Sequence, residues 1–249
     1  MRLQGKVAVV TGGGAGIGRG IVLCMAKEGA DIAIPDIQEG NAQAVVKEVQ
    51  AMGRKAVAMR CDVTKGTDVQ AALDRVKKEL GRIDILVNNA GMASAPGMPF
   101  TNNSEEDWDK TYAVNLKSVF LMCKAIVPYF IERKAGRIIN IASIAGPLAA
   151  TTMPPYSVAK GGVITFTRVI AKELAAHGIT VNAICPGFFP SKMSKVVMER
   201  AGQLMLDGTP TRRLGGEEDL KGLAVLLASE ASRHITGQAI AVDGGASVI

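Results

Sequence analysis

Short runs rich in valine, isoleucine and alanine alternate with longer helical patterns along nearly the whole of this 249-residue chain. Strands are predicted over residues 6–11, 31–36, 55–60, 83–88, 137–142, 179–185 and 239–242. Helices are predicted over 42–52, 69–80, 108–133 and 156–177, among others, because apolar residues recur there at i, i+3 and i+4. The strand runs are apolar without strict alternation, which is typical of parallel strands covered by helices on both faces. The pattern predicts an α/β fold with a doubly wound, seven-stranded parallel sheet in a single domain spanning residues 1–249.

Two details refine this prediction. Glycines suited to end a helix follow several of the helical stretches: Gly29, Gly53, Gly81, Gly136 and Gly178. Residues 188–216 break the rhythm of strands and helices, and we expect them to form an inserted lid with a short helix.

Composition excludes several classes of protein. Hydrophobic residues make up 48% of the chain and charged residues 21%, which excludes intrinsic disorder. No apolar run approaches the ~18 residues of a transmembrane helix, and the N-terminus lacks the apolar region of a signal peptide, so we expect a cytoplasmic protein without a membrane segment. The net charge is +6, but the basic residues are scattered and no aromatic residues alternate with them, so no nucleic-acid partner is expected.

Cysteine and histidine usage predicts no disulfide framework and no metal site. Cys24, Cys61, Cys123 and Cys185 are widely spaced, without a CxxC pair, and the two histidines lack metal-ligand spacing. We expect the thiols to be reduced, as they are in the cytosol.

A glycine-rich turn connects the first predicted strand to the first helical pattern. Gly12, Gly16 and Gly18 carry the spacing G-x3-G-x-G. Glycine lets the backbone turn tightly and approach a pyrophosphate, and a following helix N-terminus offers free N–H groups to the anion. A tight turn without a ligand is the alternative, but the place of the turn in an alternating chain favours dinucleotide binding.

Asp36 closes the second predicted strand, 18 residues after Gly18. A carboxylate there can accept hydrogen bonds from an adenosine ribose and would repel a 2′-phosphate. Neither Ala15 nor Ile37 supplies a compensating cation, so NAD is expected over NADP, although Arg19 and Arg60 remain candidate phosphate partners. The alternative role for Asp36 is that of N-cap for the following helix.

Tyr156 and Lys160 open a predicted helix and, four residues apart, share one of its faces. A free phenol has a pKa of about 10, so a tyrosine that acts as a base at neutral pH needs its pKa lowered by roughly three units. A neighbouring ammonium group and a cationic nicotinamide ring would lower it. The alternative is a solvated pair on the helix surface.

These motifs, taken in order, resemble the short-chain dehydrogenase/reductase family, in its form of roughly 250 residues. The resemblance covers essentially the whole chain. It depends on the turn at 11–18, Cys61-Asp62-Val63, Asn88-Asn89-Ala90-Gly91, Asn115, Ser143, Tyr156-x3-Lys160 and Pro186-Gly187.

The resemblance implies a Rossmann-like fold and four catalytic residues. Asn115 matches the asparagine that holds a water linking the active site to solvent through the lysine. Ser143 would hydrogen-bond the substrate oxygen, and Tyr156 would exchange a proton with it. Lys160 would hold the nicotinamide ribose and lower the pKa of Tyr156.

The resemblance also implies a nicotinamide cofactor site. Its positions are Gly12, Gly14, Gly16, Ile17, Gly18, Asp36, Ile37, Cys61, Asp62, Val63, Asn89, Ala90, Gly91, Tyr156, Lys160, Pro186, Gly187, Phe189 and Ser191. Asp62 and Val63 match the pair that contacts adenine, and Pro186 and Gly187 would place the nicotinamide carboxamide. Where the family commonly has threonine, this chain has Ser191, which can make the same hydrogen bond.

The substrate is expected to be a hydrophobic secondary alcohol or its ketone, cyclic or aromatic. The predicted substrate-binding residues are Ser143, Leu148, Met153, Tyr156, Phe188 and Met193. The alternative is that the apolar members of this set pack the lid onto the body of the protein.

Two other functions stay open. One is an NADPH-dependent reductase of 3-oxoacyl thioesters, whose acidic carrier or coenzyme A could contact Lys192, Lys195, Arg200, Arg212 and Arg213. The other is a non-catalytic nucleotide-sensing protein. The resemblance further implies a homotetramer in which helices 108–133 and 156–177 pair across one interface and the C-terminal segment lies at another.

Overall fold

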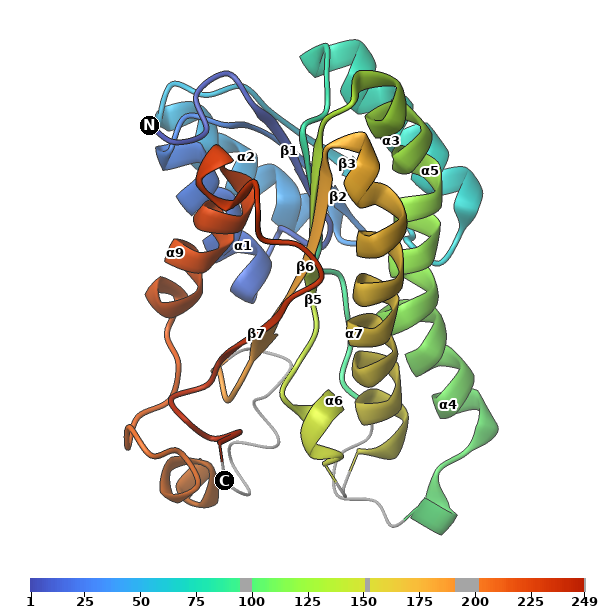
Figure 1. The fold of residues 1–249 in the computed structure, drawn as a ribbon, viewed down its shortest axis with the longest axis vertical. Helices are drawn as coiled ribbons and strands as arrows, with labels where there is room; N and C mark the ends of the chain where they lie inside the picture. Colours follow the sequence, from blue (N-terminus) through green and yellow to red (C-terminus); the bar gives the residue numbers. More distant parts are fainter. Residues whose placement is uncertain (95–99, 151–152, 191–201, 249) are drawn as a thin grey trace.

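The computed structural model describes residues 1–94, 100–150, 153–190 and 202–248 and contains a seven-stranded sheet in the order β3-β2-β1-β4-β5-β6-β7 (Figure 1). The strands are β1 (Val7–Val10), β2 (Asp31–Asp36), β3 (Ala56–Arg60), β4 (Ile85–Asn88), β5 (Gly136–Ile141), β6 (Ile179–Pro186) and β7 (Ala239–Val242). Every neighbouring pair is parallel. The predicted α/β fold with a seven-stranded parallel sheet is confirmed.

Helices cover both faces of this sheet, with α1, α2 and α9 on one side and α3, α5 and α7 on the other (Figure 1). The α-helices are α1 (Gly16–Lys27), α2 (Glu39–Ala51), α3 (Gly66–Leu80), α4 (Glu105–Tyr112), α5 (Ser118–Arg133), α6 (Ala145–Leu148), α7 (Pro154–Leu174) and α9 (Glu217–Ala228). The shorter helical segments are η1 (Phe100–Asn102), η2 (Ala113–Lys117), η3 (Ala175–His177) and η4 (Glu230–Ser232).

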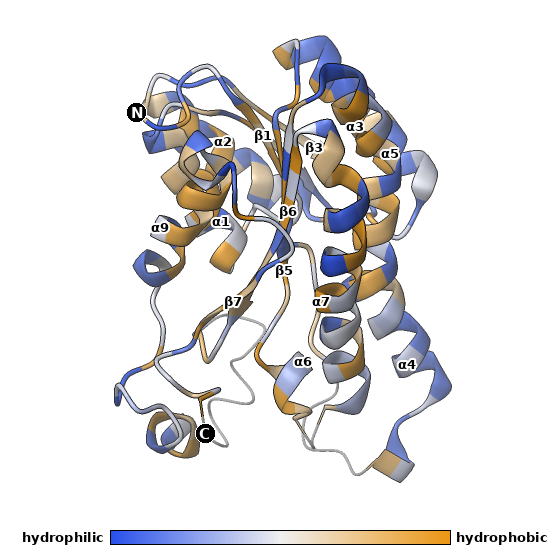
Figure 2. Cartoon of the chain, viewed as in Figure 1, coloured by the Kyte–Doolittle hydropathy of each residue, from blue (hydrophilic) through white to orange (hydrophobic). Residues whose placement is uncertain are grey.

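The core consists of two apolar layers, one on each face of the sheet. Along β1, Val9 belongs to the layer with α3, α5 and α7, while Ala8 and Val10 belong to the layer with α1, α2 and α9. Successive strand side chains point to opposite faces, so a strand buried on both sides needs an unbroken apolar run. Figure 2 shows this as apolar colouring along the strands and the inward helix faces.

The strand order reverses at β1 and β4, in the centre of the sheet. β1 pairs with β2 on one side and with β4 on the other, so the chain leaves β1 and β4 in opposite directions. Open parallel sheets bind ligands at such a switch point. The glycine-rich turn and the segments that follow β4, β5 and β6 all lie at this edge.

One sequence prediction is confirmed with an added detail, and another needs correction. The helix predicted over 108–133 is part of the continuous helix Glu105–Arg133, which consists of α4, η2 and α5. The segment η2 is a π-helical turn, and the spacing of apolar residues did not reveal the extra residue that it contains. Gly136 does not end a helix, because Lys134 is the left-handed cap of α5 and Gly136 opens β5. A Cβ on Gly136 would lie 2.3 Å from Cδ2 of Phe130, which explains the glycine.

Within the described ranges, the continuous helix Glu105–Arg133 is long and apolar enough by length and composition to cross a membrane. Its inner face carries Val119, Met122, Ile126 and Phe130, which are buried against the sheet. It is a core helix of this fold.

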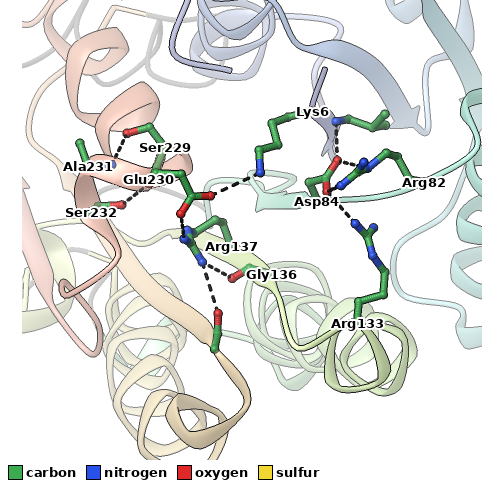
Figure 3. A network of polar contacts seen from close by, with 12 residues as sticks. Lys6, Arg82, Asp84, Arg133, Gly136, Arg137, Ser229, Glu230, Ala231 and Ser232 are labelled. Atoms are coloured by element: carbon green, nitrogen blue, oxygen red, sulfur yellow. Dashed lines mark hydrogen bonds and ion pairs between the residues drawn. The ribbon is translucent and has the colours of Figure 1, made fainter. Parts of the chain in front are cut away.

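A buried carboxylate joins three segments at the amino-terminal edge of the sheet (Figure 3). Asp84, which is 8% exposed, accepts hydrogen bonds from the backbone N–H of Val7 at 2.9 Å, from Arg82 Nη2 at 2.6 Å and from Arg133 Nη2 at 3.1 Å. The carboxylate thus ties β1 and α5 to the segment that enters β4.

We expect Asp84→Asn to lower the free energy of unfolding by about 2 kcal/mol, because it removes charge-assisted bonds that are shielded from water. Glu230 is the matched control: it pairs with Lys6 and Arg137, but its side chain is 67% exposed. Glu230→Gln should cost less than about 1 kcal/mol. Urea unfolding of both variants measures the difference, and equal losses would contradict the importance assigned to Asp84.

Candidate active site

The glycine-rich turn is held in shape by the segment that follows β4. Gly12 and Gly16 have φ of 63° and 52°, a left-handed conformation that favours glycine. Asn89 Nδ2 donates to the carbonyls of Thr11 and Gly12 at 2.9 and 3.0 Å. A Cβ on Gly18 would lie 2.4 Å from both Asn89 Nδ2 and the Gly12 oxygen, so only glycine allows this close packing.

The N-terminus of α1 is open toward this turn. Its N-cap, Ala15, makes no side-chain hydrogen bond, and its first turn contains no acidic residue. Backbone N–H groups at such an end carry a partial positive charge and suit a phosphate. Ile17 packs against the core layer on the α1 side, which fixes the first turn of the helix.

Asp36 lies against the glycine-rich turn. Its Oδ2 accepts from the N–H of Gly14 at 3.0 Å, and its Oδ1 accepts from the N–H of Gln38 at 2.9 Å. The N-cap alternative is wrong, because the N-cap of α2 is Gln38. Ile37, the next residue, is 52% exposed.

Arg19, a candidate phosphate partner, forms a paired contact with Glu48. Its Nε and Nη2 lie 3.1 and 2.6 Å from the two carboxylate oxygens of that residue. Arg60, the other candidate, is exposed and is the register partner of Asp36 on the neighbouring strand.

The segment after β3 presents one polar side chain between two buried ones. Cys61 and Val63 are 1% and 8% exposed, and burial raises the pKa of the Cys61 thiol to about 11. Asp62 accepts from the hydroxyl and the backbone N–H of Thr64, which lowers its pKa. This carboxylate is therefore charged and oriented, while Cys61 is a neutral packing residue.

Ser143 follows β5, and its neighbours are tied to β6. The N–H groups of Ala142 and Ile144 donate to the carbonyls of Ile184 and Pro186 at 2.8 and 3.1 Å. The Ser143 hydroxyl accepts from the N–H of Ala145 at 3.1 Å. These bonds fix the backbone on both sides of the serine, which is 9% exposed.

Tyr156 and Lys160 lie in the first turns of α7, which begins with two prolines suited to a helix start. Lys160 is 4% exposed, so the alternative of a solvated surface pair is wrong. Its Nζ donates to the carbonyl of Ile141 at 2.8 Å and lies 5.7 Å from the centre of the Tyr156 ring. Ser143 hydrogen-bonds the phenol of Tyr156. The structure thus brings Ser143, Tyr156 and Lys160 together.

Burial governs the protonation of this group. It raises the pKa of Tyr156, and the hydrogen bond from Ser143 opposes that rise. It lowers the pKa of Lys160 to about 8. Without a bound cofactor the phenol is therefore neutral at pH 7, and most of the lysine carries its proton.

Asn115 is placed beside this group by the π-helical turn η2. Its side chain accepts from the N–H of Met92 at 3.1 Å and donates to the Met92 carbonyl at 2.9 Å. A Cβ on Gly91 would lie 2.8 Å from Asn115 Oδ1 and 3.6 Å from Lys160 Nζ. Gly91, with Ala90 before it, therefore lies where the turn after β4 meets the lysine.

The segment after β6 divides between the two faces of the sheet. Gly187 has no room for a side chain, because a Cβ would lie 2.7 Å from Cβ of Asp243. Phe188 packs against the layer that holds α7, and Phe189 packs against the layer that holds α1. Phe188 therefore lies on the face of the sheet that is covered by α7, the helix that carries Tyr156.

Of the remaining residues predicted to bind substrate, cofactor or an acidic carrier, some lie within the described part of the chain and some outside it. Leu148, at the end of α6, is 47% exposed, and Met153 is the N-cap of α7. Ser191 and Met193 lie outside the described residues, as do Lys192, Lys195 and Arg200.

Thr11 shapes the candidate site, although the sequence patterns gave it no role of its own. Its hydroxyl accepts from the N–H groups of Asn89 and Ala90, each at 3.0 Å. A threonine directly after an apolar strand and before a glycine turn is the signal that could have revealed it.

Comparison with known proteins agrees with this geometry. The family described as Enoyl-(Acyl carrier protein) reductase matches residues 12–247. The chain is 38% identical over 245 residues to the 3-oxoacyl-[acyl-carrier-protein] reductase of Thermotoga maritima, covering 98% of this chain and 99% of that one.

Two solved structures are also similar. A short-chain type dehydrogenase/reductase from Mycobacterium marinum superposes with a TM-score of 0.95 at 34% identity, covering 99% of this chain and 97% of that one. An NAD⁺-bound xylitol dehydrogenase superposes with a TM-score of 0.94 at 31% identity, covering 98% and 100%. The chain belongs to the short-chain dehydrogenase/reductase family.

Proposed function

We propose that this protein is an NAD-dependent oxidoreductase that interconverts a secondary alcohol and its ketone. The observation that carries the proposal is the group of Ser143, Tyr156 and Lys160 at the carboxyl edge of the sheet, in which the serine and the lysine are buried and the tyrosine is partly buried, beside an open helix N-terminus. A hydrogen-bond donor, a proton-exchanging phenol and a buried ammonium group are the parts that carbonyl reduction needs. A nucleotide sensor without catalysis has no use for this combination.

Each of the four residues has a defined task in this proposal. The Ser143 hydroxyl donates to the substrate oxygen, where negative charge develops during reduction. Tyr156 gives its phenolic proton to that oxygen, or takes it back during oxidation. Lys160 donates to the nicotinamide ribose, and its charge stabilises the phenolate form of Tyr156. Asn115 holds the turn after β4 in place and a water beside Lys160.

The cofactor would lie across the glycine-rich turn, where Ala15 and Gly16 at the start of α1 are exposed, and the nicotinamide would supply or accept the hydride. Gly12, Gly14, Gly16, Ile17 and Gly18 would line the pyrophosphate. Ile37, Asp62, Val63, Asn89 and Ala90 would surround the adenosine. Pro186, Gly187 and the backbone of Phe189 would hold the carboxamide.

NAD is favoured over NADP by the charges around Asp36. Its carboxylate lies at the turn that would hold the adenosine ribose, as its contact with Gly14 indicates. The paired contact with Glu48 holds Arg19, so a 2′-phosphate would have to compete with that carboxylate for the guanidinium.

Asp36→Asn should shift the ratio of kcat/KM values for NAD and NADP by about 10–100-fold toward NADP, because it removes a charge that repels the 2′-phosphate by a few kcal/mol. Steady-state rates with each cofactor measure the ratio. Asp74→Asn, which neutralises an exposed carboxylate on α3, is the control and should leave the ratio unchanged. An Asp36 variant with the wild-type ratio would contradict the assignment.

The substrate is proposed to be hydrophobic. Apolar residues on the elements around Tyr156 support this: Met153 is the N-cap of the same helix, Leu148 ends α6, and Phe188 packs against the layer that holds α7. The half-exposed Leu148 is available to a ligand. The similarity to an acyl-carrier-protein reductase supports the alternative function, in which a thioester substrate, the runner-up, is reduced with NADPH. The similarity to the xylitol dehydrogenase supports small polyols as substrates.

A panel of secondary alcohols and ketones with NADH and NADPH, together with a 3-oxoacyl thioester, tests the proposal. We expect the highest kcat/KM with cyclic or aromatic ketones and NADH. Activity confined to small polyols would overturn the hydrophobic substrate, and faster thioester reduction with NADPH would establish the runner-up.

Three further properties are proposed with this function. The lid predicted over 188–216 lies partly outside the described residues, and its described parts, 188–190 and 202–216, are proposed to border the substrate. The exposed side chains of Phe120 on α5 and Val169 on α7 support a homotetramer that buries these helices, and a monomer in light scattering at micromolar concentration would refute it.

The free thiols of the described cysteines support a cytoplasmic location.

A further inference from the structure

Three buried polar side chains lie deeper in the fold than the catalytic residues and join the strands to α7. Asn88 ends β4, Asn140 is its register partner on β5, and Thr167 lies on α7. The three residues are 3%, 0% and 0% exposed. The proposed function gives none of them a role.

Hydrogen bonds link the three in a fixed direction. Asn88 Nδ2 donates to Asn140 Oδ1 at 2.8 Å, and Asn140 Nδ2 donates to Thr167 Oγ1, also at 2.8 Å. The Thr167 hydroxyl in turn donates to the carbonyl of Val163 at 2.8 Å. The Thr167 hydroxyl proton is used in the bond to Val163 within α7, so the Thr167 oxygen can only accept a further hydrogen bond. The side-chain amide of Asn140 must therefore turn its nitrogen, not its oxygen, toward α7.

Burying these groups in an apolar layer is costly unless they are paired, and aliphatic side chains would pack there without that cost. Their placement suggests what they do instead. Thr167 follows Lys160 by seven residues, which is two helical turns, so both lie on the face of α7 that meets β5. Asn140 precedes Ser143 by three residues.

Helix α7 is therefore attached to β5 at two points. Lys160 Nζ bonds the carbonyl of Ile141 at the catalytic end, and Thr167 bonds Asn140 deeper in the layer. In the proposed function Lys160 also donates to the cofactor ribose, so the first attachment involves a catalytic group. The second does not involve a catalytic group.

We propose that Asn140 is a positioning residue: through Thr167, with its own amide oriented by Asn88, it holds α7 so that Tyr156 and Lys160 stay aligned with Ser143 during the reaction. This inference rests on the proposed function, because it assumes that these three residues react with the substrate and cofactor.

Thr167→Val tests the proposal, since it keeps the shape of the side chain and removes the oxygen that accepts from Asn140. We expect kcat for alcohol oxidation to fall by about 10–100-fold, the loss typical of a catalytic group displaced by about 1 Å. KM for NAD should change little, and the apparent pKa in the pH profile of kcat should rise. Thr167→Ser keeps the hydroxyl and should restore both. Thr167→Ala, which has the same expected loss, replaces the valine variant if that protein is insoluble.

The control for lost stability is Val76→Ala, a fully buried position on α3 in the same apolar layer. Each variant is assayed at a temperature where circular dichroism shows it fully folded. The proposal is overturned by a Thr167→Val protein with wild-type kcat and pH profile, by a Thr167→Ser protein as impaired as the valine variant, or by an equal loss in Val76→Ala. An active Tyr156→Phe protein would instead show that the proposed function fails.

Discussion

Tyr156→Phe should lower kcat in both directions by about 10²–10⁴-fold, which is the usual contribution of a positioned acid or base. The phenol is the group that the Ser143 hydroxyl contacts, and it is held by the same helix as Lys160. Removing one oxygen leaves the ring in place. Cofactor affinity should therefore remain close to that of the unmodified protein, since the glycine-rich turn and Lys160 are unchanged.

The measurement pairs steady-state NADH absorbance with a fluorescence titration of NADH binding. Tyr112→Phe is the control, because Tyr112 is 46% exposed on α4 and should leave kcat unchanged. A Tyr156→Phe protein that keeps both NADH binding and turnover would remove the proposed acid–base role and revive the nucleotide-sensing alternative.

The pKa of Tyr156 adds a directional expectation. Burial raises it above its ordinary value of 10.0, so the free protein presents a neutral phenol at pH 7. This is the form that donates a proton, so ketone reduction should be nearly independent of pH from 6 to 8. Alcohol oxidation needs the phenolate and should speed up as pH rises, with the positive charges of Lys160 and oxidised nicotinamide extending activity to lower pH.

Local sequence was sufficient for much of the fold and for the site. Apolar runs without alternation predicted the parallel sheet because strands buried on both faces cannot have a polar side. The turn at Gly12, Gly16 and Gly18 could be found because the backbone conformation of the first two and the close packing of the third require glycine. Tyr156 and Lys160 could be paired because helical geometry fixes residues four apart on one face.

The features that the sequence did not reveal depend on contacts between distant segments. The spacing of apolar residues does not reveal the π-helical turn that contains Asn115, where the asparagine side chain contacts the backbone of Met92. Gly136 looked like a helix cap, but it is needed because the ring of Phe130 lies against it. The pairing of Arg19 with Glu48 joins two helices and has no local signature.

Lys160→Met should abolish activity and at the same time stabilise the protein by about 2 kcal/mol at pH 7. Burial lowers the pKa of Lys160 from 10.5 to about 8, so folding places a charge where it is disfavoured. At 1.36 kcal/mol per unit, the shift corresponds to roughly 3 kcal/mol, and the lost hydrogen bond to Ile141 offsets about 1 kcal/mol. Methionine has a similar length and no charge. Catalytic groups commonly have such a cost in stability.

The pH dependence of this gain follows from the sign of the shift. Below about pH 8 the lysine is charged in both folded and unfolded protein, so the folded state bears the full cost. As pH rises from 8 to 10.5 the folded lysine is neutral while the unfolded one still binds a proton, and the cost falls toward zero. The Lys160→Met protein should therefore lose its advantage over the unmodified protein by about pH 10.

Urea unfolding of both proteins at pH 7, 8.5 and 10 measures the difference directly. Lys172→Met provides the control, because Lys172 is exposed on the same helix and should change the unfolding free energy by less than about 0.5 kcal/mol at every pH. A Lys160→Met protein that is less stable at pH 7, or whose advantage does not fall with rising pH, would show that the buried ammonium group is stabilised by its surroundings. In that case the proton of Lys160 would be held more tightly before the cofactor binds than its lowered pKa indicates.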